Sequence, residues 1–213
     1  WFSENLIKRG YDPVIFCANV RHIKNDVIKV DNQKYSIDAK DGIPFVFIKT
    51  TKATSNGLDR IKNMFIFYKN LFSTAKQYSN IYGKPDVILA SSVHPLTLVA
   101  GIKIAKKFGV PCICEIRDLW PESLVAYRYL KKNSPITKIL YLGEKWIYKN
   151  ADSIIMTWEG GRKYIIDQGW DRQIDINKVK HISNGVTIDS FDENSKANEV
   201  IDLDLGDKNY KNL

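Results

Sequence analysis

The segment 115–122 concentrates acidic and basic side chains together with a Trp and a Pro. It follows an apolar run, residues 110–114, that predicts a buried strand. His94 stands in the same position after another apolar run, just before a helix that begins at Pro95. Parallel strands of an α/β sheet end at one edge, and such folds bind ligands there, so we expect these side chains to lie together.

These residue types indicate a definite chemistry. The edge would carry an imidazole, two carboxylates and a guanidinium, from His94, Glu115, Asp118 and Arg117. A guanidinium suits bidentate contact with a phosphate, and a carboxylate or imidazole can accept the proton of a hydroxyl. The set therefore predicts a site for a hydroxylated, phosphate-bearing substrate. Two plainer interpretations stay open: His94 is an ordinary loop histidine, or Glu115 and Arg117 form a structural ion pair.

Strands and helices alternate along the chain, and this order predicts how the site is held. Apolar runs bounded by turn residues predict strands over 13–20, 43–50, 85–91, 110–116, 152–157 and 178–183. Helical spacing predicts the end of a helix before Gly10 and helices over 57–79, 95–108, 136–149 and 160–168. Residues 21–42 are polar and are expected to be irregular. We therefore expect an α/β fold with a mostly parallel, doubly wound sheet and helices on both faces.

Several familiar motifs are absent from the sequence. No G-x-G-x-x-G follows the first predicted strand, no Walker A lysine loop occurs, and no histidine pair has zinc-ligand spacing. Cys17, Cys112 and Cys114 lie in apolar runs, which is typical of buried, reduced thiols in a cytosolic protein, and we expect no metal site. Gly160 and Gly161 open a helix, where they either present backbone N–H groups to an anion or merely form the turn.

The chain is basic, with a formal net charge of +8. Residues 187–213 are acidic and are expected to form a linker, so residues 1–186 are more basic than the whole chain. A basic body suits a nucleic acid, an anionic membrane surface or a phosphate-bearing substrate. No nucleic-acid-binding motif occurs, so nucleic acid is not an expected partner. No apolar run is long enough for a transmembrane helix.

Two predicted helices combine basic and aromatic side chains, as surfaces that bind anionic membranes do. The face of helix 136–149 expected to meet the membrane is basic and aromatic: Lys138, Tyr141, Leu142, Lys145, Tyr148 and Lys149. Its opposite, apolar face is expected to join the core: Ile136, Ile139, Leu140, Gly143 and Ile147. Helix 57–79 is a second candidate through Ile66 and Phe67, outside the stripe expected in the core: Leu58, Ile61, Phe65, Tyr68, Phe72 and Ala75. A solvated helix face is the alternative for both.

Several segments, by their order and spacing, resemble the N-terminal domain of family-4 retaining glycosyltransferases: residues 85–96, 115–122, 144–148, 151–155 and 182–186. Ser183 stands where the family has Pro, and Thr187 where it has Asp. The likeness extends over nearly the whole chain and is closest to bacterial O-antigen and capsule enzymes of the fucosaminyltransferase type.

The resemblance implies a GT-B enzyme, in which two Rossmann-like domains face each other across a cleft. Residues 1–186 would form the N-terminal, acceptor-binding domain, and residues 187–213 the linker to a donor-binding domain outside this sequence. The family's first strand and glycine-rich loop would precede Trp1. Because that strand lies in the middle of the family's sheet, a chain without it is expected to expose an unpaired edge.

The resemblance also implies roles for individual residues at matching positions. Asp118 would orient the acceptor hydroxyl, and His94, the second catalytic residue, would lie close to the transferred sugar. The acceptor site would be completed by Glu115, Arg117, Trp120 and Glu122. Asn184 and Gly185 would mark the crossing to the donor side. Such enzymes usually need no catalytic metal.

The expected function is that of a retaining glycosyltransferase in O-antigen or capsule biosynthesis. It would transfer a sugar from a nucleotide-sugar, expected to be a UDP-sugar, to a glycan linked to a polyprenyl diphosphate. It would lie in the cytoplasm as a peripheral protein at the inner face of the cell membrane. Two alternatives stay open: a GT-B nucleotide-sugar epimerase, and a non-catalytic half that needs a separate donor-binding subunit.

Overall fold

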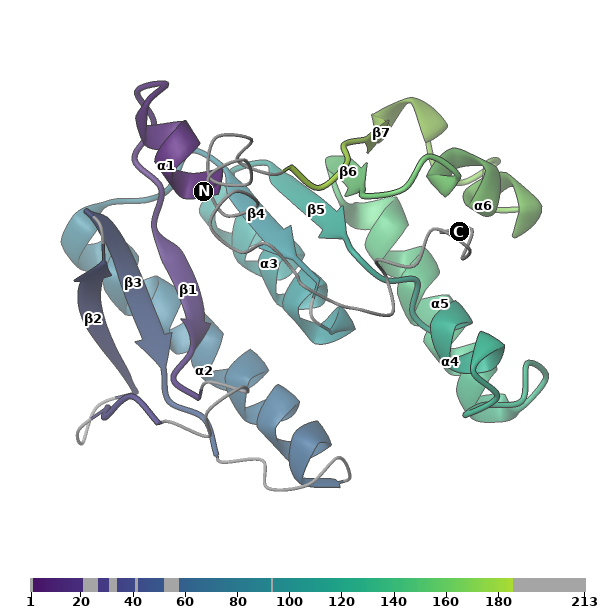
Figure 1. The fold of residues 1–213 in the computed structure, drawn as a ribbon, viewed down its shortest axis with the longest axis horizontal. Helices are drawn as coiled ribbons and strands as arrows, with labels where there is room; N and C mark the ends of the chain where they lie inside the picture. Colours follow the sequence, from purple (N-terminus) through teal and green to yellow (C-terminus); the bar gives the residue numbers. More distant parts are fainter. Residues whose placement is uncertain are drawn as a thin grey trace, which may run out of the picture. The chain divides into compact units, whose positions relative to one another are not determined.

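The computed structural model describes residues 2–20, 27–30, 34–40, 42–51, 58–92 and 94–185. The chain divides into two units, residues 2–183 and residue 1 with residues 184–213. All the described helices and strands lie in the first unit (Figure 1). The helices are α1 (Phe2–Ile7), α2 (Leu58–Tyr82), α3 (Pro95–Phe108), α4 (Glu122–Ala126), α5 (Pro135–Asn150) and α6 (Gly161–Asp167), with a 3₁₀ helix at Ile176–Lys178. The strands are β1 (Ile15–Ala18), β2 (Tyr35–Lys40), β3 (Ile43–Ile48), β4 (Ile88–Ser91), β5 (Cys112–Ile116), β6 (Ser153–Met156) and β7 (Val179–His181).

The strands form two sheets. One has four parallel strands in the order β4-β5-β6-β7, joined by crossover helices. The other has the order β1-β3-β2, in which β1 runs parallel and β2 antiparallel to β3. The predicted α/β fold with a mostly parallel sheet is confirmed.

Two neighbouring strands, β1 and β4, each keep one edge without a partner among the described strands. Beside the edge of β4, the apolar side chains of Val87 and Leu89 are 46% and 40% exposed. Helices α2 and α3 connect the two sheets: buried residues of β3, α2 and α3 form one cluster, and Phe16 of β1 and Ile88 of β4 pack against it (Figure 1). The fold therefore joins its sheets through a shared helical layer and exposes the kind of unpaired edge that the sequence predicted.

The main hydrophobic core lies between the four-stranded sheet and helices α3, α5 and α6. Cys112, Cys114 and Ile116 alternate on the covered face of β5, and Ile154 and Met156 continue that face on β6. Both cysteines are buried and free, as predicted for reduced thiols, and Cys17 is half-buried and free.

Strand β2 was not predicted, since residues 21–42 were expected to be irregular. It pairs with β3 as a hairpin in which Lys40 faces Ile43 across Asp41 and Gly42. Gly42 has a φ of +76°, the left-handed conformation that tight hairpin turns require. The Asp-Gly pair was therefore the sequence signal for this strand, whose outer residues are largely exposed.

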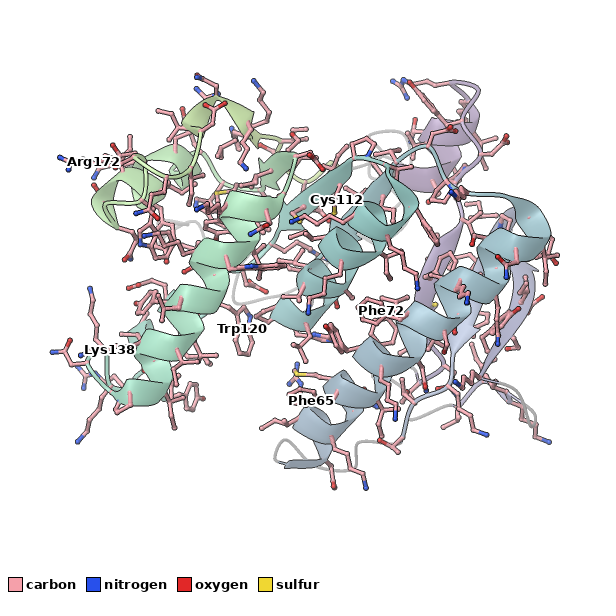
Figure 2. The ribbon with its side chains drawn as sticks, turned by 180° about the vertical axis from the view of Figure 1, so that it is seen from behind. Phe65, Phe72, Cys112, Trp120, Lys138 and Arg172 are labelled. Carbon is pink, nitrogen blue, oxygen red and sulfur yellow. The ribbon has the colours of Figure 1, made fainter. Side chains whose placement is uncertain are left out.

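Helix α2 buries only part of the predicted face. Ala75 is buried and Tyr68 and Phe72 pack against the core as expected, but Phe67, expected outside the core as a membrane candidate, is buried as well. Phe67, Leu71 and Ala75 are buried against β3 and α3, whereas Ile61 and Phe65 are 51% and 58% exposed. Figure 2 shows Phe72 between α2 and α3, where it packs at the border of the same cluster. Apolar residues occupy both adjacent faces of this helix, so helical spacing alone did not distinguish between them.

Helix α5 also turns a different face to the core. Tyr148, expected on the outer face, is buried with Ile147, whereas Ile136 and Ile139, expected in the core, are 63% and 67% exposed. Tyr148 can lie inside because its hydroxyl donates a hydrogen bond to a buried partner, Glu144. The prediction for helix 136–149 is therefore wrong in placing Tyr148 on the exposed face and Ile136 and Ile139 in the core.

Gly101 allows α3 to pack directly on β4, because a Cβ at this position would lie 2.5 Å from the Cβ of Ala90. We expect Gly101→Ala to lower the free energy of unfolding by about 1–3 kcal/mol through overpacking. Gly143 of α5 is the matched control, since a Cβ there meets nothing within 4 Å. Gly143→Ala should raise the free energy of unfolding by up to about 1 kcal/mol through helix propensity. Urea denaturation measures both, and equal effects would contradict this account of α3 packing.

Candidate active site

The ends of β4 and β5 are tied together by hydrogen bonds that continue beyond the strands. Ser91 pairs with Glu115 in the parallel register. The next residue, Ser92, donates its backbone N–H to the Glu115 carbonyl at 3.0 Å and accepts the Arg117 N–H on its Oγ at 2.9 Å. The segments that follow the two strands are thus held at one edge, as the sequence predicted.

A small hollow opens at this edge. Its residues come from the two tied segments, from the first turns of α3 and from the inner face of α5: Ser92, Pro95, Leu98, Ile116, Asp118, Trp120, Glu144, Ile147 and Tyr148. Figure 2 shows Trp120 between α3 and α5. Asp118 is exposed and Trp120 is half-buried, so a carboxylate stands beside an aromatic surface at the mouth of the hollow. The hollow has a volume of only about 20 Å³, room for about one water molecule. A sugar would therefore lie against its mouth, with a hydroxyl on the carboxylate and its ring on the aromatic side chain.

Two charged residues near Asp118, Arg117 and Glu115, can be compared with the predicted site. Arg117 is exposed and Glu115 is half-buried. Within the described part of the chain no ion pair joins the two, so the alternative of a structural Glu115–Arg117 pair is not realised there. Glu122 accepts a hydrogen bond from the Tyr141 hydroxyl and so links α4 to α5.

His94 lies apart from this hollow. Its side chain is 9% exposed and packs edge-on against Phe67 of α2, with ring centroids 6.2 Å apart. Burial, with a smaller contribution from the charge of Arg60, lowers the pKa of His94 to about 4. The imidazole is therefore neutral near neutral pH, and its Nδ1 has no partner among the described residues. His94 is a buried residue of the α2–α3 interface, not an exposed loop histidine.

Glu144 is the site residue that sequence analysis missed. Its side chain is 4% exposed and accepts hydrogen bonds from the hydroxyls of Tyr148 and Tyr164, both at 2.8 Å. Burial raises the pKa of Glu144 to about 8, against the lowering effect of the two tyrosines. The same burial, and the nearby carboxyl, raise the pKa of both hydroxyls. A spacing of three residues from Ile147, which was expected in the core, was the available signal that Glu144 faces inward.

The remaining predicted residues lie elsewhere. Asn184 and Gly185 are exposed and belong to the unit of residues 184–213 with Trp1, whose other residues fall outside the described part of the chain. No three potential metal ligands gather among the residues that the structure describes. None of the described helices is long and apolar enough to cross a membrane.

Comparison with known proteins places this geometry in a family. The family model described as Glycosyltransferase Family 4 matches residues 2–190. A comparison with curated protein sequences gave no match. Sucrose-phosphate synthase from Thermosynechococcus elongatus has a similar structure, with a TM-score of 0.59 and 16% sequence identity over 91% of this chain and 44% of the synthase. HepE of Anabaena, solved in complex with UDP-glucose, matches with a TM-score of 0.44 and 15% identity over 74% of this chain and 36% of HepE.

The likeness to the synthase shows the fold, which is that of the N-terminal, Rossmann-like half of a GT-B glycosyltransferase. This chain spans less than half the length of the synthase.

Glu144 should make folding stability depend on pH. Its pKa is about 8 in the folded protein and 4.5 ordinarily, so the folded state holds a proton that the unfolded state has lost between these values. The free energy of unfolding should therefore fall as the pH rises from about 5 to about 8, by about 3 kcal/mol from this group. Glu144→Gln, which stays neutral, should remove most of that decline in urea denaturation. Glu159→Gln, at an exposed position, should keep it; an unchanged decline in Glu144→Gln would contradict the assignment.

Proposed function

The chain belongs to glycosyltransferase family 4, and we propose that it is the acceptor-binding domain of a retaining glycosyltransferase. The enzyme would transfer a sugar from a UDP-sugar or similar nucleotide-sugar to a glycan on a polyprenyl diphosphate, in O-antigen or capsule synthesis. The observation that carries the proposal is the placement of Asp118 and Trp120 around one hollow at the ligand-binding edge of the parallel sheet. Donor binding would fall to a domain beyond residues 1–186.

The geometry suggests how the chain's residues would act. The exposed Asp118 carboxylate would accept a hydrogen bond from the acceptor hydroxyl and aim its oxygen at the sugar carbon C1. The new C1–O bond would form on the face from which the C1–phosphate bond breaks, and the proton would pass to the departing phosphate oxygen. Asp118 orients the nucleophile in this scheme, and Arg117, exposed beside it, would contact a phosphate.

Trp120 and Glu122 would complete the acceptor site, with Glu115 behind them at the end of β5. Glu122 would act through its position, because its hydrogen bond to Tyr141 holds α4 on α5. His94 remains the second proposed catalytic residue. Its neutral imidazole has a buried Nδ1 with no partner among the described residues, so contact between His94 and a ligand would require the α2–α3 interface to open.

The role of Asp118 can be tested in the complete enzyme. Asp118→Asn keeps the shape of the side chain but removes its charge, so we expect turnover to fall by about a hundredfold or more without loss of folding. Asp86→Asn is the matched control, since Asp86 is exposed at the amino end of β4, away from the hollow. Transfer of radiolabelled sugar to a lipid-linked acceptor measures both. Full activity of Asp118→Asn would refute the site, and sugar isomerisation without transfer would refute the reaction.

We further propose that the enzyme sits on the cytoplasmic face of an anionic membrane through α5 and the segment before it. The apolar stripe of α5 is exposed: Ile136 by 63%, Ile139 by 67%, Leu142 by 66% and Trp146 by 37%. Tyr127 and Tyr129 add rings that are 75% and 78% exposed. Exposed basic side chains belong to the same two segments: Arg128, Lys131, Lys132 and Lys138. Figure 2 shows Lys138 extending outward from α5. Apolar groups with a basic rim suit an interface rich in anionic lipid.

Membrane binding by the apolar stripe can be measured with vesicles that contain phosphatidylglycerol. Ile139→Ser should weaken binding roughly tenfold, because it removes an apolar side chain from the lipid interface. Ile81→Ser is the matched control, since Ile81 is 66% exposed at the end of α2. Lys138→Ala should weaken binding at low salt and have little effect at high salt. Equal losses in the two serine variants would contradict docking through α5.

A further inference from the structure

A second hollow lies beyond the site of Asp118 and Trp120, at the carboxyl ends of β6 and β7. It has a volume of about 300 Å³. Its lining comes from the end of β6, the start of α6 and strand β7: Met156, Trp158, Glu159, Gly161, Arg162, Val179, Lys180 and His181. Of these residues the sequence analysis singled out only Gly161, the first residue of α6, as part of a glycine pair that either presents backbone N–H groups to an anion or merely forms the turn.

The hollow carries two cationic side chains, Arg162 and Lys180, and one carboxylate, Glu159. No ion pair joins Glu159 to either of them among the described residues. Arg162 donates its Nε–H to the Val179 carbonyl at 2.9 Å, which fixes the guanidinium beside β7. Its terminal nitrogens and the ammonium of Lys180 have no partner among the described residues. The neighbouring Lys163, outside the hollow, is instead paired with Asp167 at 2.6 Å. A concave surface on which cationic side chains outnumber the carboxylate, and form no described ion pair with it, favours binding of an anion.

The walls of the hollow keep it open and give it an apolar side. Gly161 packs against the end of β6 so closely that a Cβ would lie 2.1 Å from the Sδ of Met156. No side chain can therefore project from this position of α6. Trp158 forms part of the lining and is half-buried, so a flat or apolar group can lie beside the cations. His181 contributes an imidazole whose Nε2 is 3.2 Å from the Ser183 hydroxyl.

We propose that this hollow binds the diphosphate of a substrate, with Arg162 in bidentate contact and Lys180 and His181 beside it. A preoriented guanidinium with free terminal nitrogens matches the spacing of phosphate oxygens, and a lysine adds a mobile charge. The volume accommodates a diphosphate with part of the group that it carries. The source of that diphosphate, a nucleotide or a lipid-linked acceptor, rests on the proposed function; the anion site itself does not.

Binding of inorganic pyrophosphate to the 213-residue chain tests the site by isothermal titration calorimetry. We expect saturable binding that Lys180→Ala weakens roughly tenfold, as loss of one charge-assisted contact should. Lys163→Ala is the matched control: it makes the same change of charge on an adjacent surface, and it should leave binding within about twofold. Arg162→Lys keeps the charge but loses the planar fork, so it should also weaken binding severalfold. Absence of saturable binding, or equal losses in Lys180→Ala and Lys163→Ala, would overturn the proposal.

Two further ligands identify the source. If UDP binds more tightly than pyrophosphate and loses affinity in Lys180→Ala, the hollow takes a nucleotide diphosphate. If farnesyl diphosphate binds more tightly than pyrophosphate and loses affinity in Lys180→Ala, the hollow takes the diphosphate of a lipid-linked substrate. Equal affinities for all three would mean that the hollow recognises the diphosphate alone. These binding measurements require no transfer reaction. A complete enzyme without transferase activity would therefore refute the proposed function and leave the proposed anion site unaffected.

Discussion

The proposed site depends on two hydrogen bonds made by Ser92, which continue the parallel pairing of β4 and β5 to the residues just after the strands. The Ser92 backbone binds the Glu115 carbonyl, and its hydroxyl receives the N–H of Arg117. Because Ser92 is 5% exposed, these bonds lie away from competing water. They fix the path of the chain into Asp118 and Trp120, and Gly101 sets α3 directly beneath the same strands. A ligand can thus meet side chains from three elements in a defined arrangement.

Buried polar groups determine how α5 and α6 close around this edge. Glu144 reaches Tyr148 on its own helix and Tyr164 on α6, while Glu122 and Tyr141 link α4 to α5. A neutral carboxyl with hydrogen-bonded oxygens can stay inside at modest free-energy cost, whereas a charged one without partners cannot. The same network turns the apolar stripe of α5 outward, because Tyr148 and Ile147 occupy the inner face. The face of α5 that is buried therefore determines both the hydrogen-bond network around Glu144 and the apolar residues that α5 exposes.

The distribution of charge gives the carboxyl edge of the sheet two distinct regions. Around β4 and β5 the hollow has carboxyl groups and an aromatic ring, which suits hydroxyls and sugar rings. Around β6 and β7 the second hollow has a guanidinium and an ammonium that form no ion pair with Glu159 or another described residue, which suits phosphates. The chain belongs to glycosyltransferase family 4, and the proposed transfer would use both chemistries, one for a hydroxyl acceptor and one for a phosphate-bearing substrate. The edges of β1 and β4, which have no partner among the described strands, are a separate feature, where the shared layer of α2 and α3 holds the sheets together.

The sequence by itself determined the order of most strands and helices, though not β2 or α4, and the edge at which Asp118 and Trp120 lie. Both follow from apolar periodicity and from short-range turn signals. It did not determine which face of α2 or α5 is buried, since each helix has apolar residues on neighbouring faces and the choice depends on what packs against it. The burial of His94 and Glu144, and hence their shifted pKa values, arises from partners more than fifteen residues away such as Phe67 and Tyr164. The cluster of Arg162 and Lys180 likewise comes from segments that only the parallel pairing of β6 and β7 brings together. Local residue spacing therefore determined most of the secondary structure, and long-range packing determined which side chains are buried, paired or shifted in pKa.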